Sequence, residues 1–154
     1  EANLQDFDVL ILFRLSLLEH GFKLDKKSPY TIKRIQKSVR YMKNYLKKED
    51  NKYFIAYLNS LPVGYLHVTY DNKKERHSSY LSELFILDLY RNLGIGKKLI
   101  YYQWRYLKKI NITENKLTTT KYKNEKTINF YKQMRYALIK ENKRKNIVYF
   151  SKKL

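Results

Sequence analysis

The stretch that decides the fold is ELFILDLYRNLGIGKKLI, which runs from Glu83 to Ile100. An apolar strand ends within it and a helix begins, and the pattern Arg91-x-x-Gly94-x-Gly96 lies at the joint. The first turn of a helix has N–H groups without partners and the positive end of the helix dipole. Glycines let a phosphate approach that backbone because no Cβ stands in the way, and an arginine fork suits phosphate oxygens. The stretch therefore predicts a phosphate-binding turn.

Lys97 and Lys98 add positive charge directly after the turn. Taken alone, the pattern is also compatible with an ordinary tight turn between a strand and a helix. The dinucleotide-binding pattern is not met, because no glycine stands two places before Gly94, and the Walker pattern fails because no Gly-Lys-Ser or Gly-Lys-Thr follows. The segments around the turn must decide between these alternatives.

Hydrophobic spacing on both sides of the turn predicts a mixed α/β chain. Helices are expected over residues 6–19, 28–48, 96–109 and 125–134, and strands over 53–58, 63–70, 80–87, 116–121, 136–140 and 147–151. Asp6 is the predicted cap of the first helix, which His20-Gly21 is expected to end. Ser28-Pro29 is expected to open the second helix. The first two strands and the last two are expected to form hairpins.

The composition points to one domain that covers residues 1–154, since 44% of the residues are apolar and no linker is visible. The chain has no cysteine, which excludes disulfides, thiolate zinc sites and a cysteine nucleophile. The longest apolar run, from Val9 to Phe13, is too short to span a bilayer. Because no targeting segment is visible, we expect a cytoplasmic protein without membrane contact.

The net charge is strongly positive, with 33 Lys and Arg against 14 Asp and Glu, a formal +19. One interpretation is a polyanionic partner such as RNA. The other is a genome rich in A and T, whose codons favour Lys, Asn, Ile and Tyr. The basic residues are spread along the chain, which favours the second interpretation. In either case the field attracts an anionic ligand.

A second block strengthens the phosphate-binding alternative. Asn124 opens a predicted helix that contains Phe130-Tyr131 and is followed by Arg135-Tyr136. Together with the turn, its preceding Tyr90-Arg91 pair and Val63-Gly64 in the first hairpin, this block resembles the GNAT (GCN5-related N-acetyltransferase) superfamily. The resemblance covers roughly residues 53–150. Two positions depart from the family pattern: Arg135-Tyr136 replaces the usual Gly-Phe, and Thr127 replaces the usual Ala.

The resemblance implies a central, mostly antiparallel sheet that is splayed at the cofactor site and flanked by helices. It also implies acetyl-CoA as the acyl donor, with the pantetheine arm in the splayed gap. The residues that the resemblance assigns to cofactor binding are Ile86, Leu87, Arg91, Asn92, Leu93, Gly94, Ile95, Gly96, Lys97, Asn124 and Tyr131.

The implied chemistry is transfer of the acetyl group to a primary amine in a ternary complex. A backbone N–H at Ile86 or Leu87 would stabilise the oxyanion, and Tyr131 would protonate the departing thiolate. Glu83 is the expected base, and His67 is the second choice. Asn124 is expected either to hold the cofactor or to cap its helix.

Other classes of function stay open at this point. A basic RNA- or ribosome-binding module without catalysis fits the charge, although no nucleic-acid motif is present. A relative that binds CoA only as a sensor is a third possibility. No cluster of His, Asp and Glu has metal-ligand spacing, so no metal is expected. The acceptor is a small-molecule or peptide amine that the sequence does not identify, and a homodimer is possible.

Overall fold

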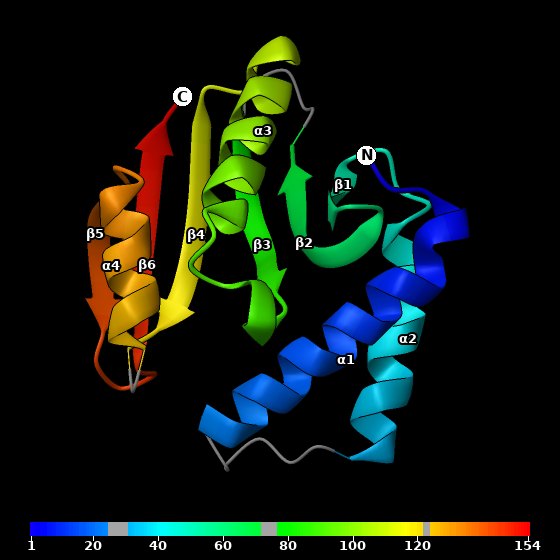
Figure 1. Cartoon of the computed structure of the whole chain (residues 1–154). Coiled ribbons are helices and arrows are strands. Elements are labelled where there is room, and N and C mark those ends of the chain that lie inside the picture. Colours follow the sequence, from blue (N-terminus) through cyan, green and yellow to red (C-terminus); the bar gives the residue numbers. More distant parts are fainter. Residues whose placement is uncertain (25–30, 72–76, 122–123) are drawn as a thin grey trace.

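The computed structural model describes residues 1–24, 31–71, 77–121 and 124–154 (Figure 1). Its helices are α1 (Phe7–Leu24), α2 (Ile32–Tyr45), α3 (Ile95–Lys109) and α4 (Glu125–Gln133). Its strands are β1 (Asn51–Leu58), β2 (Leu61–Tyr70), β3 (Ser78–Ile86), β4 (Glu114–Thr120), β5 (Ala137–Asn142) and β6 (Ile147–Lys153). Two short 3-10 helices, η1 (Leu4–Asp6) and η2 (Asp88–Tyr90), precede α1 and follow β3. The predicted order of helices and strands is confirmed.

The strands form one sheet in the order β1-β2-β3-β4-β6-β5. All neighbours are antiparallel except β3 and β4, which are parallel. Among the described residues, β3 and β4 pair only over Ser78–Tyr80 and Glu114–Lys116. Beyond that point the two strands diverge, and Figure 1 shows the gap widening toward η2. The expected splayed, mostly antiparallel sheet is thus confirmed.

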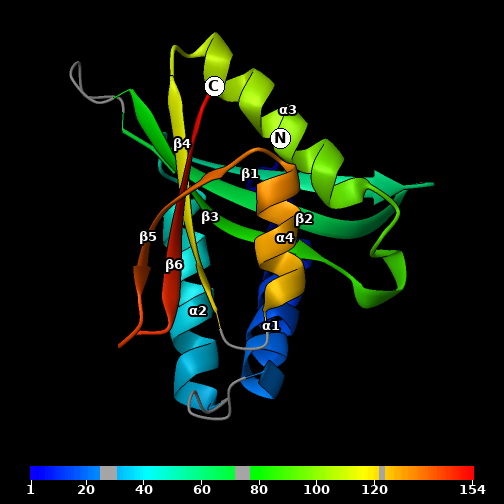
Figure 2. The ribbon, with the colours of Figure 1, turned by 90° about the vertical axis from the view of Figure 1, so that its left-hand side faces the viewer.

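Two helical layers cover the sheet (Figures 1 and 2). Side chains of a strand alternate between the two faces, so Phe54 and Leu66 pack in the core that contains α3 and α4. Their neighbours Tyr53 and Tyr65 pack in a second core with α1 and α2. The sheet therefore separates a core with α3 and α4 on one face from a core with α1 and α2 on the other, and the gap between β3 and β4 lies between these two faces.

The leading helices differ from the predicted ones at their ends. The helix α1 continues through His20-Gly21 to Leu24, so the prediction that Gly21 ends it is wrong. An ion pair of 2.8 Å between Glu19 and Lys23 spans the glycine on the helix surface and supports the additional turn. Ser28 and Pro29 lie outside the described residues. The observed cap of α2 is Thr31, whose hydroxyl accepts a hydrogen bond from the Arg34 N–H.

The turn after α4 forms without a glycine. Arg135 adopts φ 60°, a left-handed conformation that a glycine accommodates at lower cost. The Tyr136 N–H donates to the Tyr131 carbonyl at 3.1 Å, which is the hydrogen bond of a Schellman motif at a helix C-terminus. The buried Tyr136 and Met134 side chains hold this turn against the core. None of the helices in the described ranges has the length and apolar character needed to cross a membrane.

Candidate functional site

The bend between β3 and α3 is open at Gly94. Gly94 is the N-cap of α3 with φ 76° and ψ 0°, and Asn92 is also left-handed at φ 64°. A Cβ built on Gly94 would meet no atom within 4 Å beyond its chain neighbours, so the space beside Gly94 is open. The first helical hydrogen bond runs from the Lys98 N–H to the Gly94 carbonyl, 3.0 Å. The preceding N–H groups lie ahead of the helical ladder and are available to an anion.

Gly96 lies at the contact between α3, β3 and α4. A Cβ there would stand 3.6 Å from the Phe130 Cζ and 3.9 Å from side-chain atoms of Ile86 and Leu84. These are ordinary contact distances, so a methyl group could be accommodated. Gly96 therefore brings the start of α3 close to the strand end without being sterically obligatory.

Arg91 braces the end of β3. Its Nε donates to the Ile86 carbonyl at 3.0 Å, and its Nη2 lies 2.7 Å from an Asp88 carboxylate oxygen. The guanidinium carbon lies 5.8 Å from the centre of the Phe85 ring. The structure thus places Arg91 against the strand rather than directed only at solvent, with part of its charge balanced by Asp88.

The two backbone groups of Leu87 have partners inside the protein. Its N–H donates to the Val63 carbonyl of β2 at 3.0 Å, and its carbonyl accepts from the Tyr90 N–H at 2.9 Å. Successive strand residues direct their backbone groups to opposite sides, so Ile86 faces the gap toward β4. Arg91 occupies the Ile86 carbonyl, which leaves the N–H of Ile86 as the main-chain group of that residue that faces the gap at the strand end.

Gly64 makes the close contact behind this donor possible. It pairs with Ile86 in the β2–β3 register. A Cβ on Gly64 would lie 2.5 Å from the Phe85 carbonyl oxygen and 2.6 Å from the Ile86 Cδ1. Glycine is therefore required here by close approach of the two backbones.

Tyr131 lies on α4 and is buried on the side of the sheet that also carries α3. Its ring packs against Phe130, Tyr136 and Phe150 at centroid distances of 5.4, 5.7 and 6.1 Å. Burial raises the pKa of the Tyr131 phenol, and the nearby Tyr80 raises it further. A phenol is protonated at neutral pH even at its ordinary pKa, so the Tyr131 hydroxyl can act as a donor, and the raised pKa makes it a weaker acid.

A contact between β3 and β4 was not anticipated from the sequence. The Tyr80 hydroxyl lies 2.5 Å from the Thr118 Oγ1, near the last paired residues of the two strands. This hydrogen bond bridges the point from which the strands diverge. The run of three threonines at Thr118–Thr120 is the signal that could have indicated polar side chains along the gap.

Asn124 stands at the N-terminus of α4 but does not cap it through its side chain. Its Nδ2 donates instead to the Thr119 Oγ1 at 2.7 Å and to the Thr120 carbonyl at 3.1 Å. Its own carbonyl accepts the first helical hydrogen bond, from Ile128. Asn124 therefore ties the start of α4 to the end of β4.

Glu83 lies on the other side of the sheet, where α1 and α2 pack. Its carboxylate forms an ion pair with Arg14 of α1 and accepts a hydrogen bond of 2.6 Å from the Tyr65 hydroxyl. The side chains of Arg14 and Glu83 are only 14% and 12% exposed, so bulk water screens this pair weakly. The ion pair fixes the position of the carboxylate, and it joins residues that lie far apart in the sequence.

His67, the second choice as base, is buried in a structural role. Its Nε2 lies 2.9 Å from the Asn51 Oδ1, and its ring stacks on Tyr53 at 4.1 Å. The Asn51 amide nitrogen donates to Asp50, which leaves the Asn51 oxygen facing the ring. Burial and then the Arg14 charge lower the pKa of His67 to about 3. A histidine with this pKa is a weak base at neutral pH.

The described residues contain no group of three or more acidic and His side chains able to hold a metal ion.

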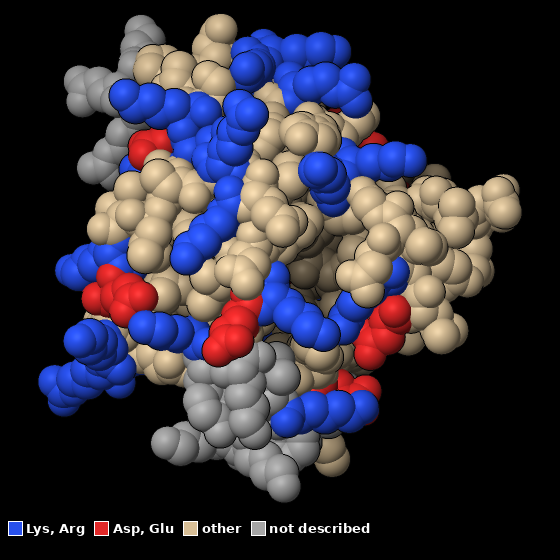
Figure 3. All heavy atoms as spheres, turned by 60° about the vertical axis from the view of Figure 1, so that its left-hand side comes forward, with Lys and Arg blue, Asp and Glu red and all other residues tan. Residues whose placement is uncertain are grey.

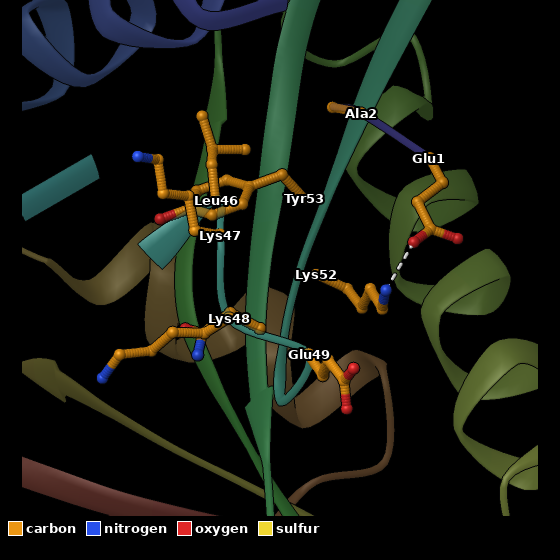
Figure 4. A pocket seen from close by; sticks show the side chains of 9 residues that line it. Glu1, Ala2, Leu46, Lys47, Lys48, Glu49, Lys52 and Tyr53 are labelled. Atoms are coloured by element: carbon orange, nitrogen blue, oxygen red, sulfur yellow. Dashed lines mark ion pairs between the residues drawn. The ribbon is translucent and has the colours of Figure 1, made fainter. Parts of the chain in front are cut away.

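Figure 3 shows a central hollow on one face of the molecule, with Lys and Arg side chains around it. Two further hollows lie away from the turn. The smaller, of about 180 Å³, is shown in Figure 4, where Lys52 and Glu1 point toward one another at 2.8 Å. Its lining residues are Glu1, Ala2, Leu46, Lys47, Lys48, Glu49, Asn51, Lys52 and Tyr53. The larger, of about 500 Å³, is lined by Tyr101, Trp104, Arg105, Lys108, Lys152, Lys153 and Leu154. Residues 92–97 line neither of these two.

Comparison with known proteins agrees with this arrangement. The sequence model of the family described as "Acetyltransferase (GNAT) family" matches residues 20–136. The N-alpha-acetyltransferase 50 of Danio rerio is 28% identical over 89 residues, which are 58% of this chain and 53% of that protein. The match therefore spans about half the length of that relative.

Solved structures share the fold over nearly the whole chain. The PaiA N-acetyltransferase of Thermoplasma acidophilum, in complex with coenzyme A, has a TM-score of 0.77 and 16% identity, covering 99% of this chain and 96% of that one. A GNAT-family acetyltransferase of Staphylococcus aureus Mu50 has a TM-score of 0.77 and 22% identity, covering 100% and 96%.

Proposed function

Because the chain belongs to the acetyltransferase (GNAT) family, we propose that it moves an acetyl group from acetyl-CoA to a primary amine in a ternary complex. The observation that carries this proposal is the open bend at Gly94 beside a strand end that has no paired neighbour on the β4 side. An anionic ligand with a long polar arm fits both features. The bend suits its phosphates, and the unpaired strand edge suits the arm.

In this proposal the diphosphate of acetyl-CoA lies on residues 92–97. The left-handed Asn92 and Gly94 shape the bend, and the N–H groups from Ile95 to Lys97 point out of the helix start. Lys97 and Lys98 contribute charge. Arg91 acts mainly by fixing the Ile86 carbonyl, and Asn124 by fixing α4 to β4.

Acetyl-CoA supplies a thioester carbonyl that an amine can attack. The Ile86 N–H is the donor best placed to stabilise negative charge on that carbonyl oxygen, a contribution of about 10²–10³ in rate. Tyr131 donates its phenolic proton to the leaving sulfur, which is worth about 10²–10⁴. The phenol is protonated at neutral pH, and burial raises the pKa of Tyr131, so the proton is transferred only as charge develops on the leaving sulfur.

Glu83 takes the proton of the amine, directly or through water. The Glu83 carboxylate accepts a hydrogen bond from the Tyr65 hydroxyl and forms an ion pair with Arg14, and these two contacts hold it in one orientation. Arg14 acts here as a positioning residue. Because the Glu83 carboxylate lies on the side of the sheet with α1 and α2, we assign that side to the acceptor amine, which competes with Arg14 for the carboxylate.

The acceptor is a small-molecule or peptide amine. The Danio rerio relative is named for acetylation of α-amino groups, so the N-terminal amine of a peptide is one acceptor to test. The experiment is a thiol-release assay with acetyl-CoA and a panel of peptides, amino acids, polyamines and aminoglycosides. Release of CoA that depends on one amine, with acetylation of that amine by mass spectrometry, supports the proposal. Absence of amine-dependent release across the panel counts against catalysis.

A further inference from the structure

The larger hollow lies at the C-terminal part of α3, far from the glycine bend. Lys108 follows Gly96 by 12 residues, about 18 Å along the helix axis. The other wall is the end of β6, at Lys152 and Lys153. In Figure 3, Lys and Arg side chains lie over much of the face, and few Asp or Glu stand among those in its upper half, the level at which Figure 1 places the ends of α3 and β6. We call this site, with the seven lining residues given above, the aromatic-basic hollow.

The lining combines two aromatic rings with four cations and no carboxylate side chain. Tyr101 is 47% exposed, and its ring meets Trp104 edge to face at 5.2 Å. The Lys152 ammonium lies 4.6 Å from the centre of the Trp104 ring. An exposed ring with cations around it suits a planar group that carries negative charge.

The described part of the chain leaves the cations of the hollow without an ion-pair partner. Within the described residues, no ion pair includes Arg105, Lys108, Lys152 or Lys153. Glu114 lies close enough to sense Lys153, but its carboxylate is bonded to Lys116 and Ser151. Burial and then the charges of Arg135 and Lys108 lower the pKa of Lys152. An anion in the hollow would relieve this repulsion.

We propose that the aromatic-basic hollow binds a single-stranded nucleic acid, with one base stacked on Tyr101 and phosphates on Arg105, Lys108, Lys152 and Lys153. A volume of about 500 Å³ accommodates one nucleotide. Stacking on an aromatic ring and charge pairing with the backbone are the two terms of such binding. The chain's formal charge of +19 strengthens association over a longer range. The proposal does not depend on acetyl transfer.

The test uses Trp104, the single tryptophan of the chain, as a reporter within the hollow. Single-stranded 12-nucleotide RNA and DNA of the same mixed sequence are titrated at several salt concentrations. We expect saturable quenching of Trp104 fluorescence by one or both strands. With four phosphate contacts, log K should fall with log salt at a slope of about −3. A tenfold preference for RNA would identify RNA as the ligand. Equal affinity for RNA and DNA would show that the hollow binds single strands of both kinds.

The Arg105→Gln/Lys108→Gln variant should weaken binding at least about tenfold and make the salt slope shallower by about 1.4. Tyr101→Ala, which keeps every charge, should weaken binding by about 1–3 kcal/mol, or 5- to 150-fold. The control Lys33→Gln/Lys37→Gln removes the same charge from the exposed surface of α2. Equal loss in the control, binding without any change in Trp104 fluorescence, or equally tight binding of inorganic tripolyphosphate would each overturn the proposal.

Discussion

Acid should destabilise the fold through His67, and the size of the effect follows from its surroundings. The pKa of His67 falls from an ordinary 6.5 to about 3 in the folded chain. Below pH 6.5 the unfolded chain gains a proton that the folded chain does not accept until about pH 3. The stabilisation is therefore fully present above pH 6.5 and is lost as pH falls toward 3. At 1.36 kcal/mol per pKa unit, the loss is about 2 kcal/mol at pH 5 and at most about 5 kcal/mol at pH 3.

The assay is urea unfolding of the wild type and His67→Phe at pH 7.5, 6.0 and 5.0. Phenylalanine keeps a ring against Tyr53 but cannot titrate, although it leaves Asn51 without its partner. We expect the wild type to lose about 2 kcal/mol more than the variant between pH 7.5 and 5.0. His77→Asn, at an exposed position, is the control and should leave the pH dependence unchanged. Equal pH dependence in the wild type and His67→Phe would refute the reasoning, as would an NMR titration of the His67 ring near pH 6.5.

Three further substitutions and one control substitution test separate parts of the structure. Gly64→Ala should cost about 1–3 kcal/mol of unfolding free energy and weaken CoA binding, because its Cβ would stand 2.5 Å from the Phe85 carbonyl oxygen. The control Gly21→Ala, where the Cβ meets nothing within 4 Å, should stabilise by about 0.5–1 kcal/mol. Arg135→Gly should raise the unfolding free energy by about 1 kcal/mol, since φ 60° is strained for arginine; a lower melting temperature would contradict this. Tyr131→Phe should reduce kcat about 10²-fold or more with CoA affinity nearly unchanged, and unchanged turnover would remove Tyr131 from the acid role.

The order of the elements could be predicted because local signals determine it. The runs of aromatic and β-branched residues in β1 to β3 and the glycine bend are each signals that lie within a few residues. Helix ends were less predictable. Gly21 carries a local stop signal, yet α1 continues past it with the support of the Glu19–Lys23 pair. The sequence offers both Ser28 and Thr31 as caps of α2, and the local pattern does not show that Thr31 is the residue that caps it.

The contacts of the site depend on chain segments that meet only in the folded state. The ion pair between Arg14 and Glu83 joins α1 to β3, and no local pattern indicates it. Arg91 suits phosphate in isolation, but the Ile86 carbonyl lies within reach of its Nε only because η2 folds the chain back. The Tyr80–Thr118 bridge likewise requires the parallel pairing of β3 with β4.

The most direct test of the account is calorimetric titration of CoA into the wild type, Gly94→Glu and Leu89→Glu. Glutamate at position 94 places bulk and negative charge in the open bend, whereas Leu89 is 90% exposed in η2 and receives the same charge outside it. With folding of each variant verified by circular dichroism, we expect Gly94→Glu to weaken CoA binding about 100-fold or more, about 2.7 kcal/mol, and Leu89→Glu to stay close to wild type. Wild-type affinity in Gly94→Glu would contradict the assignment of the bend as the diphosphate site.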